Sequence, residues 1–120
     1  MNRGEAIGLI EAIGLATAVE AADAAVKSAN VRLIGYEPCK GDGMSTIKVA
    51  GDVGAVKAAC EAAAAACANG RGVFSVKIIP RPAEGIEKLI YNSQTVGYTP
   101  AVEKTNDESV EEESTDSTEE

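Results

Sequence analysis

Between residues 5 and 90, the apolar positions change their period in a regular order. Short runs that are apolar throughout, or that alternate with polar residues, predict β-strands, whereas apolar positions three and four residues apart predict one face of an α-helix. The predicted strands cover residues 5–11, 31–36, 45–50 and 72–80.

Two predicted helices fill the gaps between these strands, and each has one apolar stripe. The second helix is expected to begin after Asp52, whose carboxylate can accept hydrogen bonds from free backbone amides, and to end near Asn69 and Gly70. A third, short helix is expected around residues 84–90. The stripes consist of Leu15, Val19, Ala22, Val26 and Ala29 in the first helix and of Val53, Val56, Cys60, Ala63 and Cys67 in the second.

The resulting order, β-α-β-β-α-β with a terminal helix, predicts an α+β fold. It is the split β-α-β (ferredoxin-like) arrangement, an antiparallel sheet with two helices on one face. A length of 120 residues with 45% hydrophobic residues suits a single compact domain. We place this folded body at residues 3–90, a C-terminal extension at 91–104 and a disordered acidic tail at 105–120.

Composition limits how that core is built. Aromatic residues make up only 3% of the chain and Trp is absent, so the core must consist of Ala, Val, Ile and Leu. Small side chains bury little area each, so such a domain gains from partner subunits. The sequence contains no run of about 18 apolar residues, so no membrane span is predicted. The three cysteines do not resemble a disulfide framework, which favours a reducing cytosol.

The net charge of −8 comes from the end of the chain. Residues 1–100 contain ten Lys or Arg and ten Asp or Glu, while residues 101–120 contain nine acids and one lysine. Like-charge repulsion without an apolar face predicts disorder from about Thr105 onward. A solubilising tail is the simpler interpretation, and a docking segment is the alternative.

Enzymatic chemistry and nucleic-acid binding find little support. The chain has no His, no Ser or Cys with an evident partner base, and a KGDG stretch that leads into a strand, unlike a phosphate loop. A neutral body with an acidic tail does not favour nucleic acid. Cys60 and Cys67 are expected to be buried, which leaves only Cys39 unexplained by packing. A small-molecule-binding regulatory domain of the same fold remains an alternative function.

Three stretches carry a resemblance to a known family: EAADAAVKSANV (20–31), GDVGAVKAA (51–59) and IPRP (79–82). Residues 3–90 resemble the shell proteins of bacterial microcompartments, of which this chain has one domain copy. The resemblance implies a structural protein, without enzymatic activity, that forms cyclic homohexamers in the bacterial cytoplasm. Such hexamers tile, with other shell proteins of the same organelle, into a sheet around encapsulated enzymes, and a central pore passes small metabolites.

The same resemblance assigns roles to two cations. Lys27 matches the family's edge lysine, which lies along its counterpart in the neighbouring hexamer, and Arg81 matches an arginine that reaches across that edge. Without the surrounding motifs, both residues would be interpreted as ordinary exposed cations.

The family's pore is lined by the loop between the second and third strands. Here that loop consists of Pro38, Cys39, Lys40, Gly41, Asp42 and Gly43. Three hypotheses for this loop compete. In the first, the glycines let the backbone surround the axis while Asp42 or Lys40 sets the charge selectivity of the pore. In the second, Cys39 thiolates from several subunits hold a metal or iron–sulfur cluster, as some shell proteins do, and in the third, Cys39 packs beneath the loop. The first hypothesis requires no cofactor.

Overall fold

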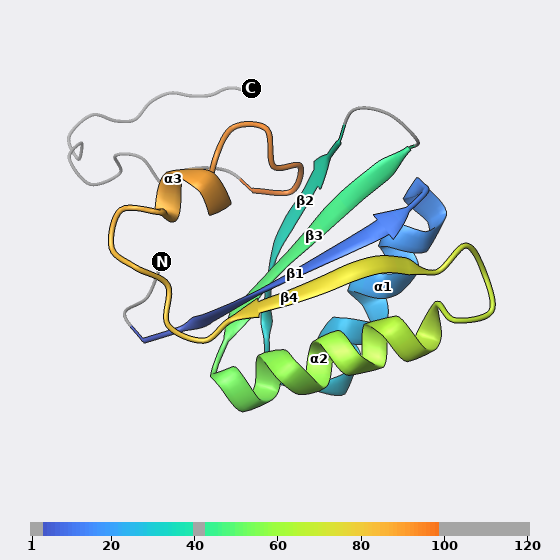
Figure 1. The fold of residues 1–120 in the computed structure, drawn as a ribbon, viewed down its shortest axis with the longest axis horizontal. Helices are drawn as coiled ribbons and strands as arrows, with labels where there is room; N and C mark the ends of the chain where they lie inside the picture. Colours follow the sequence, from blue (N-terminus) through green and yellow to red (C-terminus); the bar gives the residue numbers. More distant parts are fainter. Residues whose placement is uncertain (1–3, 40–42, 99–120) are drawn as a thin grey trace, which may run out of the picture.

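The computed structural model describes residues 4–39 and 43–98, which form one four-stranded sheet with two long helices on one face (Figure 1). The strands are β1 (Ala6–Ile13), β2 (Arg32–Pro38), β3 (Met44–Gly51) and β4 (Val73–Ile79), and the helices are α1 (Leu15–Ser28), α2 (Val53–Ala66) and α3 (Glu87–Ile90). The strand order is β2-β3-β1-β4, and all three neighbouring pairs are antiparallel. The predicted split β-α-β fold is confirmed.

Alternation along the central strand β1 separates two apolar cores. Ala6 and Ile10 belong to the larger core, which lies between the sheet and the helices α1 and α2. Ile7 points to the other side, which we call the open face, and packs there with Ile90 of α3. Both faces of β1 are therefore covered, as expected for a strand predicted from an apolar run, and successive side chains point to opposite faces.

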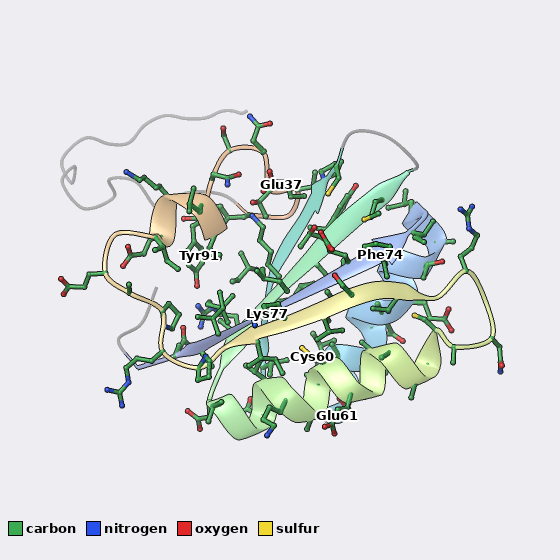
Figure 2. All side chains as sticks on the ribbon, viewed as in Figure 1. Glu37, Cys60, Glu61, Phe74, Lys77 and Tyr91 are labelled. Carbon is green, nitrogen blue, oxygen red and sulfur yellow. The ribbon has the colours of Figure 1, made fainter. Side chains whose placement is uncertain are left out.

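The helix side of the sheet is packed very closely. A Cβ atom built on Gly8 of β1 would lie 2.8 Å from Sγ of Cys60 and 2.8 Å from a methyl group of Val56. Figure 2 shows Cys60 between α2 and the sheet. Only a residue without a side chain fits at this crossing, and the many alanines of both helices permit the same close approach elsewhere.

The apolar stripe predicted for α1 is wrong in part. The buried positions are Ala18, Ala21 and Ala25, whereas Leu15 and Val19 are 57% and 58% exposed. Ala22 and Ala29 are partly buried against the core, and Val26 is exposed. The helix turns its smallest residues toward the sheet because they allow the closest packing. The larger residues of the stripe consequently lie on the outer side of the helix.

The prediction for α2 holds better. Val56, Cys60, Ala63 and Cys67 are buried, and only Val53 at the start of the helix is exposed.

The ends of the later helices differ in detail from the expectation. Asp52 occupies the N-cap position, but its side chain makes no capping hydrogen bond; its carbonyl accepts from the Val56 amide at 2.9 Å. Helix α2 ends at Ala66, three residues before the predicted Asn69, and continues as a turn. Helix α3 is shorter than predicted because Gly85, at φ +95°, interrupts the helical backbone before it.

The segment after α3 returns to the sheet. Val96 and Tyr36 of β2 exchange two backbone hydrogen bonds, of 2.6 and 3.0 Å, so residues 95–97 cover the edge of β2. A Cβ on Gly35 would overlap the carbonyl oxygen of Val96, which explains a glycine in this strand. The division at residue 90 stays a prediction, and the predicted disordered tail (105–120) lies outside the described residues.

None of the helices in the described part of the chain is both long enough and apolar enough to cross a membrane.

Candidate functional site

Loop 39–43 joins β2 to β3 at one end of the sheet. The amide of Cys39 donates to the carbonyl of Met44 at 2.8 Å, which closes the base of the loop. Gly43 has φ +68°, a region that favours glycine, and its carbonyl accepts from the amide of Gly14 at 2.8 Å. The loop is therefore tied to the turn between β1 and α1.

Only part of the predicted pore loop lies within the described residues. Pro38 is exposed at the end of β2, Cys39 is half-buried and Gly43 is exposed. Lys40, Gly41 and Asp42 lie outside the described residues, so the assignment of one of their side chains to the pore stays a prediction.

Cys39 makes contacts within its own subunit. Its Sγ lies 3.5 Å from Oγ1 of Thr46 on β3, and the thiol donates to the carbonyl of Glu37 at 3.8 Å. These contacts are what packing beneath the loop would produce. Within residues 4–39 and 43–98 of one chain, no three His, Cys, Asp or Glu side chains come together as a metal site. Among those residues, Cys39 is therefore not part of a ready-made metal site.

The other two cysteines lie in the main core, as predicted. Cys60 is 1% exposed and Cys67 is 2% exposed. Burial raises the pKa of both thiols above the usual value, and the nearby Glu61 and Glu20 carboxylates, respectively, raise it further. Neither thiol is suited to act as a ligand or a nucleophile, because both roles need the thiolate.

The two predicted edge cations lie at the opposite end of the sheet from the loop. Helix α1 starts next to Gly43 and carries Lys27 in its last turn, about 20 Å further along at 1.5 Å per residue. Arg81 follows β4, whose last residue Ile79 pairs with Ile7 near the start of β1. The strands and α1 therefore run between the loop and both cations.

Both cations are exposed to solvent. The side chain of Lys27 is 73% exposed, and its ammonium lies 2.9 Å from the carboxylate of Asp23 one helical turn earlier. Arg81 lies in an open groove of about 830 Å³ that Asp52, Glu84 and Glu87 also line. Nothing within the described part of one subunit buries either head group.

The open face holds a buried lysine that the sequence did not single out. Lys48 of β3 is 3% exposed. Its ammonium donates three hydrogen bonds, each of 2.8 Å: to the carboxylate of Glu37, to the hydroxyl of Thr95 and to the carbonyl of Ile90. All three ammonium protons thus have acceptors. The hydrogen bond from Lys48 lowers the pKa of the Glu37 carboxyl below its usual value, against the effect of burial.

A second ionic contact fastens the same C-terminal segment. The guanidinium of Arg32 binds both carboxylate oxygens of Glu5, at 2.6 and 3.0 Å, and donates to the hydroxyl of Tyr91 at 2.9 Å. The Glu5 hydrogen bond raises the pKa of Arg32, and burial raises that of Tyr91. Tyr91 and Glu37 both lie beside α3 in Figure 2. The residues after α3 are therefore held on the open face by charge.

Large apolar side chains are exposed along both sides of the fold. We call the surface of α1 and β2, with Val96, the α1–β2 flank, and the surface of α2 and β4 the α2–β4 flank. The first carries Leu15, Val19, Val26, Leu33 and Val96, and the second carries Val53, Phe74 and Val76, with exposed fractions from 37% for Val76 to 65% for Phe74. So many exposed large apolar residues on two opposite sides of the described structure are typical of surfaces that take part in protein–protein contacts.

Comparison with known proteins now decides the family. The sequence model of the BMC domain matches residues 6–82. The chain belongs to the BMC-domain family of microcompartment shell proteins. The resemblance expected from its three sequence stretches is confirmed.

Several curated BMC-domain proteins are close in sequence. The bacterial microcompartment shell protein PduA of Citrobacter freundii is 56% identical over 86 residues, which cover 72% of this chain and 91% of that protein. The carboxysome shell protein CsoS1 of Prochlorococcus marinus is 46% identical over 95 residues, covering 78% and 91%. The shell protein EutM of Salmonella typhimurium is 46% identical over 85 residues, covering 71% and 88%.

Among solved structures, the BMC-domain fold matches a crystal structure of a microcompartment protein from Desulfitobacterium hafniense DCB. The TM-score is 0.63 at 32% sequence identity, over 72% of this chain. The match covers 46% of that protein, so this chain spans about half of its length.

Proposed function

We propose that this shell protein is a structural subunit that forms a cyclic homohexamer, and that loop 39–43 surrounds the axis of the ring as a pore for small metabolites. The observation that carries the proposal is the placement of the loop and of the cations Lys27 and Arg81 at opposite ends of one sheet. Six copies with their loops at the centre would present both cations at the rim.

The two apolar flanks support a ring. A cyclic assembly joins one surface of each subunit to a different surface of the next, so each subunit needs two complementary flanks. The α1–β2 and α2–β4 flanks lie on opposite edges of the sheet, because β2 and β4 are its edge strands. Both flanks run between the central loop and the rim.

The rim contacts would join hexamers into the sheet of a shell in the bacterial cytoplasm, together with other shell proteins and around encapsulated enzymes. The close relation to proteins named as shell proteins of a microcompartment and of a carboxysome supports this assembly. No catalytic role is proposed, because the function requires only assembly and a pore.

A substitution at the rim tests the proposal. Lys27→Ala should leave hexamers intact and abolish extended sheets, since Lys27 is a surface residue whose ion pair with Asp23 contributes at most about 1 kcal/mol to folding. Native mass spectrometry measures the hexamer, and electron microscopy of concentrated protein measures the sheets. Lys88→Ala, at an exposed lysine of α3, is the matched control and should tile normally.

Three outcomes would contradict the proposal. Loss of hexamers in Lys27→Ala would move this residue from the rim to the ring contact, and unchanged sheets would remove its role. A wild-type protein that forms only dimers or trimers with a bound small molecule would instead support a regulatory domain.

We also propose that the pore works without a cofactor, because the thiol of Cys39 is engaged with Thr46 and Glu37 of its own chain. The competing hypothesis, a metal or iron–sulfur cluster held by Cys39 of several subunits, predicts brown protein with visible absorption bands after purification without oxygen. Those bands should vanish in Cys39→Ser. Colourless wild-type protein supports the cofactor-free pore.

A further inference from the structure

We propose that Phe74 is the anchor of the ring contact, and that it fills an apolar pocket between α1 and β2 of the neighbouring copy of this chain. The inference rests on the proposed ring and adds which residue and which pocket meet. It starts from two features on opposite edges of the sheet, an exposed phenylalanine and an apolar pocket, that no contact within residues 4–39 and 43–98 explains.

Phe74 is the single phenylalanine of the chain, yet 65% of it is exposed. It lies on the edge strand β4, where the pairing with β1 shifts: Glu11 is opposite Ser75, but Ala12 is opposite Val73, so Phe74 has no partner. Such a bulge on an edge strand redirects a side chain away from the regular ladder. Figure 2 shows Phe74 on β4, away from the C-terminal segment that covers part of the open face.

The opposite edge offers a complementary pocket. It has a volume of about 280 Å³ and is lined almost entirely by apolar groups of the α1–β2 flank, among them Ala18, Val19, Ala22, Leu33 and Tyr36. A cavity of about 150 Å³ can already hold a benzene ring, so this pocket can accept a phenylalanine side chain.

The pairing of the strands places the pocket and Phe74 at similar distances from the loop end of the sheet. Tyr36 of the pocket is opposite Ile47, Ile47 is opposite Ile10, and Ile10 is opposite Val76 of β4. One row across the sheet thus runs from the pocket to Val76, and Phe74 is two residues closer to the loop end. In a ring whose strands run from the centre to the rim, residues at similar distances from the centre meet across the contact between neighbouring subunits.

Charge favours the same pairing of flanks. Residues 62–83, which include β4, contain Arg71, Lys77 and Arg81 and no acid. Helix α1 carries two acids, Glu20 and Asp23, against one lysine. The net positive flank of one copy would therefore face the net negative helix of the next.

The chain's own C-terminal end is a poorer occupant of the pocket. Residues 99–120 contain no aromatic residue and only two valines among nine acids. An apolar pocket beside Glu20 and Asp23 does not suit such a sequence. A second copy, which has both the aromatic group and the opposite charge, is the occupant that fits.

A photo-crosslinking amino acid at position 74 tests the contact in the assembled full-length protein. We expect cross-links between subunits that map to residues 18–22, 33–36 or 96–97. In parallel, Phe74→Ser should raise the concentration at which half of the rings dissociate at least ten-fold, as measured by native mass spectrometry on dilution. Leu89→Ser, at a leucine of α3 that is 66% exposed, is the matched control and should leave that concentration unchanged.

The outcomes separate this inference from the proposed function. Rings that persist unchanged in Phe74→Ser, or cross-links that map elsewhere, would overturn the role of Phe74 while the hexamer stands. A wild-type protein that forms no ring would overturn the proposed function itself. Circular dichroism of the variant shows whether its subunit is folded, and the cross-link map decides the contact independently of the variant's stability.

Discussion

The two faces of the sheet are closed by different physical means. On the helix side, Gly8, Ala21 and Ala59 let α1, α2 and β1 approach until hardly any space remains. On the open face, the ammonium of Lys48 is buried beneath α3 and residues 91–98 and satisfies three acceptors. The helix side is held by the fit of small apolar groups, whereas the open face combines a smaller apolar core with a buried, fully hydrogen-bonded charge.

This difference predicts different responses to change. A close-packed apolar core loses stability in proportion to the volume added or removed. A buried charge is costly to remove from water, so it stabilises only while its partners are complete. Single substitutions should therefore have graded effects on the helix side and large ones at Lys48.

Lys48→Met should produce the largest loss, about 3 kcal/mol in the free energy of unfolding, because it leaves Glu37, Thr95 and the Ile90 carbonyl without their shared donor. Denaturant titration measures the loss, and hydrogen exchange should show faster exchange of residues 90–98. Lys77→Met, at an exposed lysine of β4, is the control and should change stability little. An equal loss in both variants would show that the buried charge has no special role.

On the helix side, Gly8→Ala should cost about 2 kcal/mol, because the new Cβ would lie within 3 Å of Cys60, Val56 and Val49. Gly54→Ala makes the same chemical change in α2, where, apart from the helix's own backbone and the adjacent residues, no atom of the described residues lies within 4 Å of the new Cβ. It should stabilise the protein by about 0.5 kcal/mol through helix propensity. Thermal unfolding of both variants measures the contrast. An unchanged stability of Gly8→Ala would show that the core can rearrange to hold the added methyl group.

The open face should respond to acid at Glu37. The pKa of Glu37 is lowered in the folded state, chiefly by the hydrogen bond from Lys48. Its contribution to stability is therefore complete above the ordinary pKa of a glutamate, about 4.3, and is lost as the pH falls through the lower folded value. Hydrogen exchange of residues 90–98, corrected for intrinsic rates, should accelerate below about pH 4. Glu37→Gln should remove that pH dependence; an unchanged acid response would place its origin elsewhere.

Thiol reactivity compares the faces without affecting stability. Cys39, which is half-buried and contacts Thr46 of β3, should react with a maleimide in native protein. Cys60 and Cys67 should react only on unfolding, because burial both shields them and raises their pKa. Mass spectrometry of the labelled peptides measures the order of reaction. Labelling first at Cys60 would contradict the burial of the helix side.

The sequence predicts the elements of this fold well, because strands and helices differ in the period of their apolar residues. The sequence prediction misplaces the buried face of α1. Alanine is suited to either a buried or an exposed position, and both faces of this helix contain alanines, so the period of the apolar residues does not identify the buried one. Lys48 escapes notice for another reason. Its three acceptors come from residues 37, 90 and 95, and only the folded chain brings them together.

In the candidate site, too, some residues are predictable from the sequence and others only from the folded structure. Loop 39–43, Lys27 and Arg81 were found by their resemblance to family motifs, and the fold shows that they lie at opposite ends of one sheet. The bulge at Phe74 carries no sequence signal, because it depends on the pairing of β4 with β1. The pocket of the α1–β2 flank depends on the rotation of α1, which the sequence prediction misplaced.

The bridge between Tyr36 and Val96 also limits how copies of this chain can join. It occupies part of the backbone edge of β2, while the bulge at Phe74 interrupts the free edge of β4. Exposed strand edges are the usual templates for runaway fibre growth, in which chains add their backbones to one continuous sheet. With one edge capped and the other irregular, copies in the proposed assembly would have to recognise each other by side chains. A layer held together in this way can be reversible and selective about its neighbours, which a backbone-templated fibre is not.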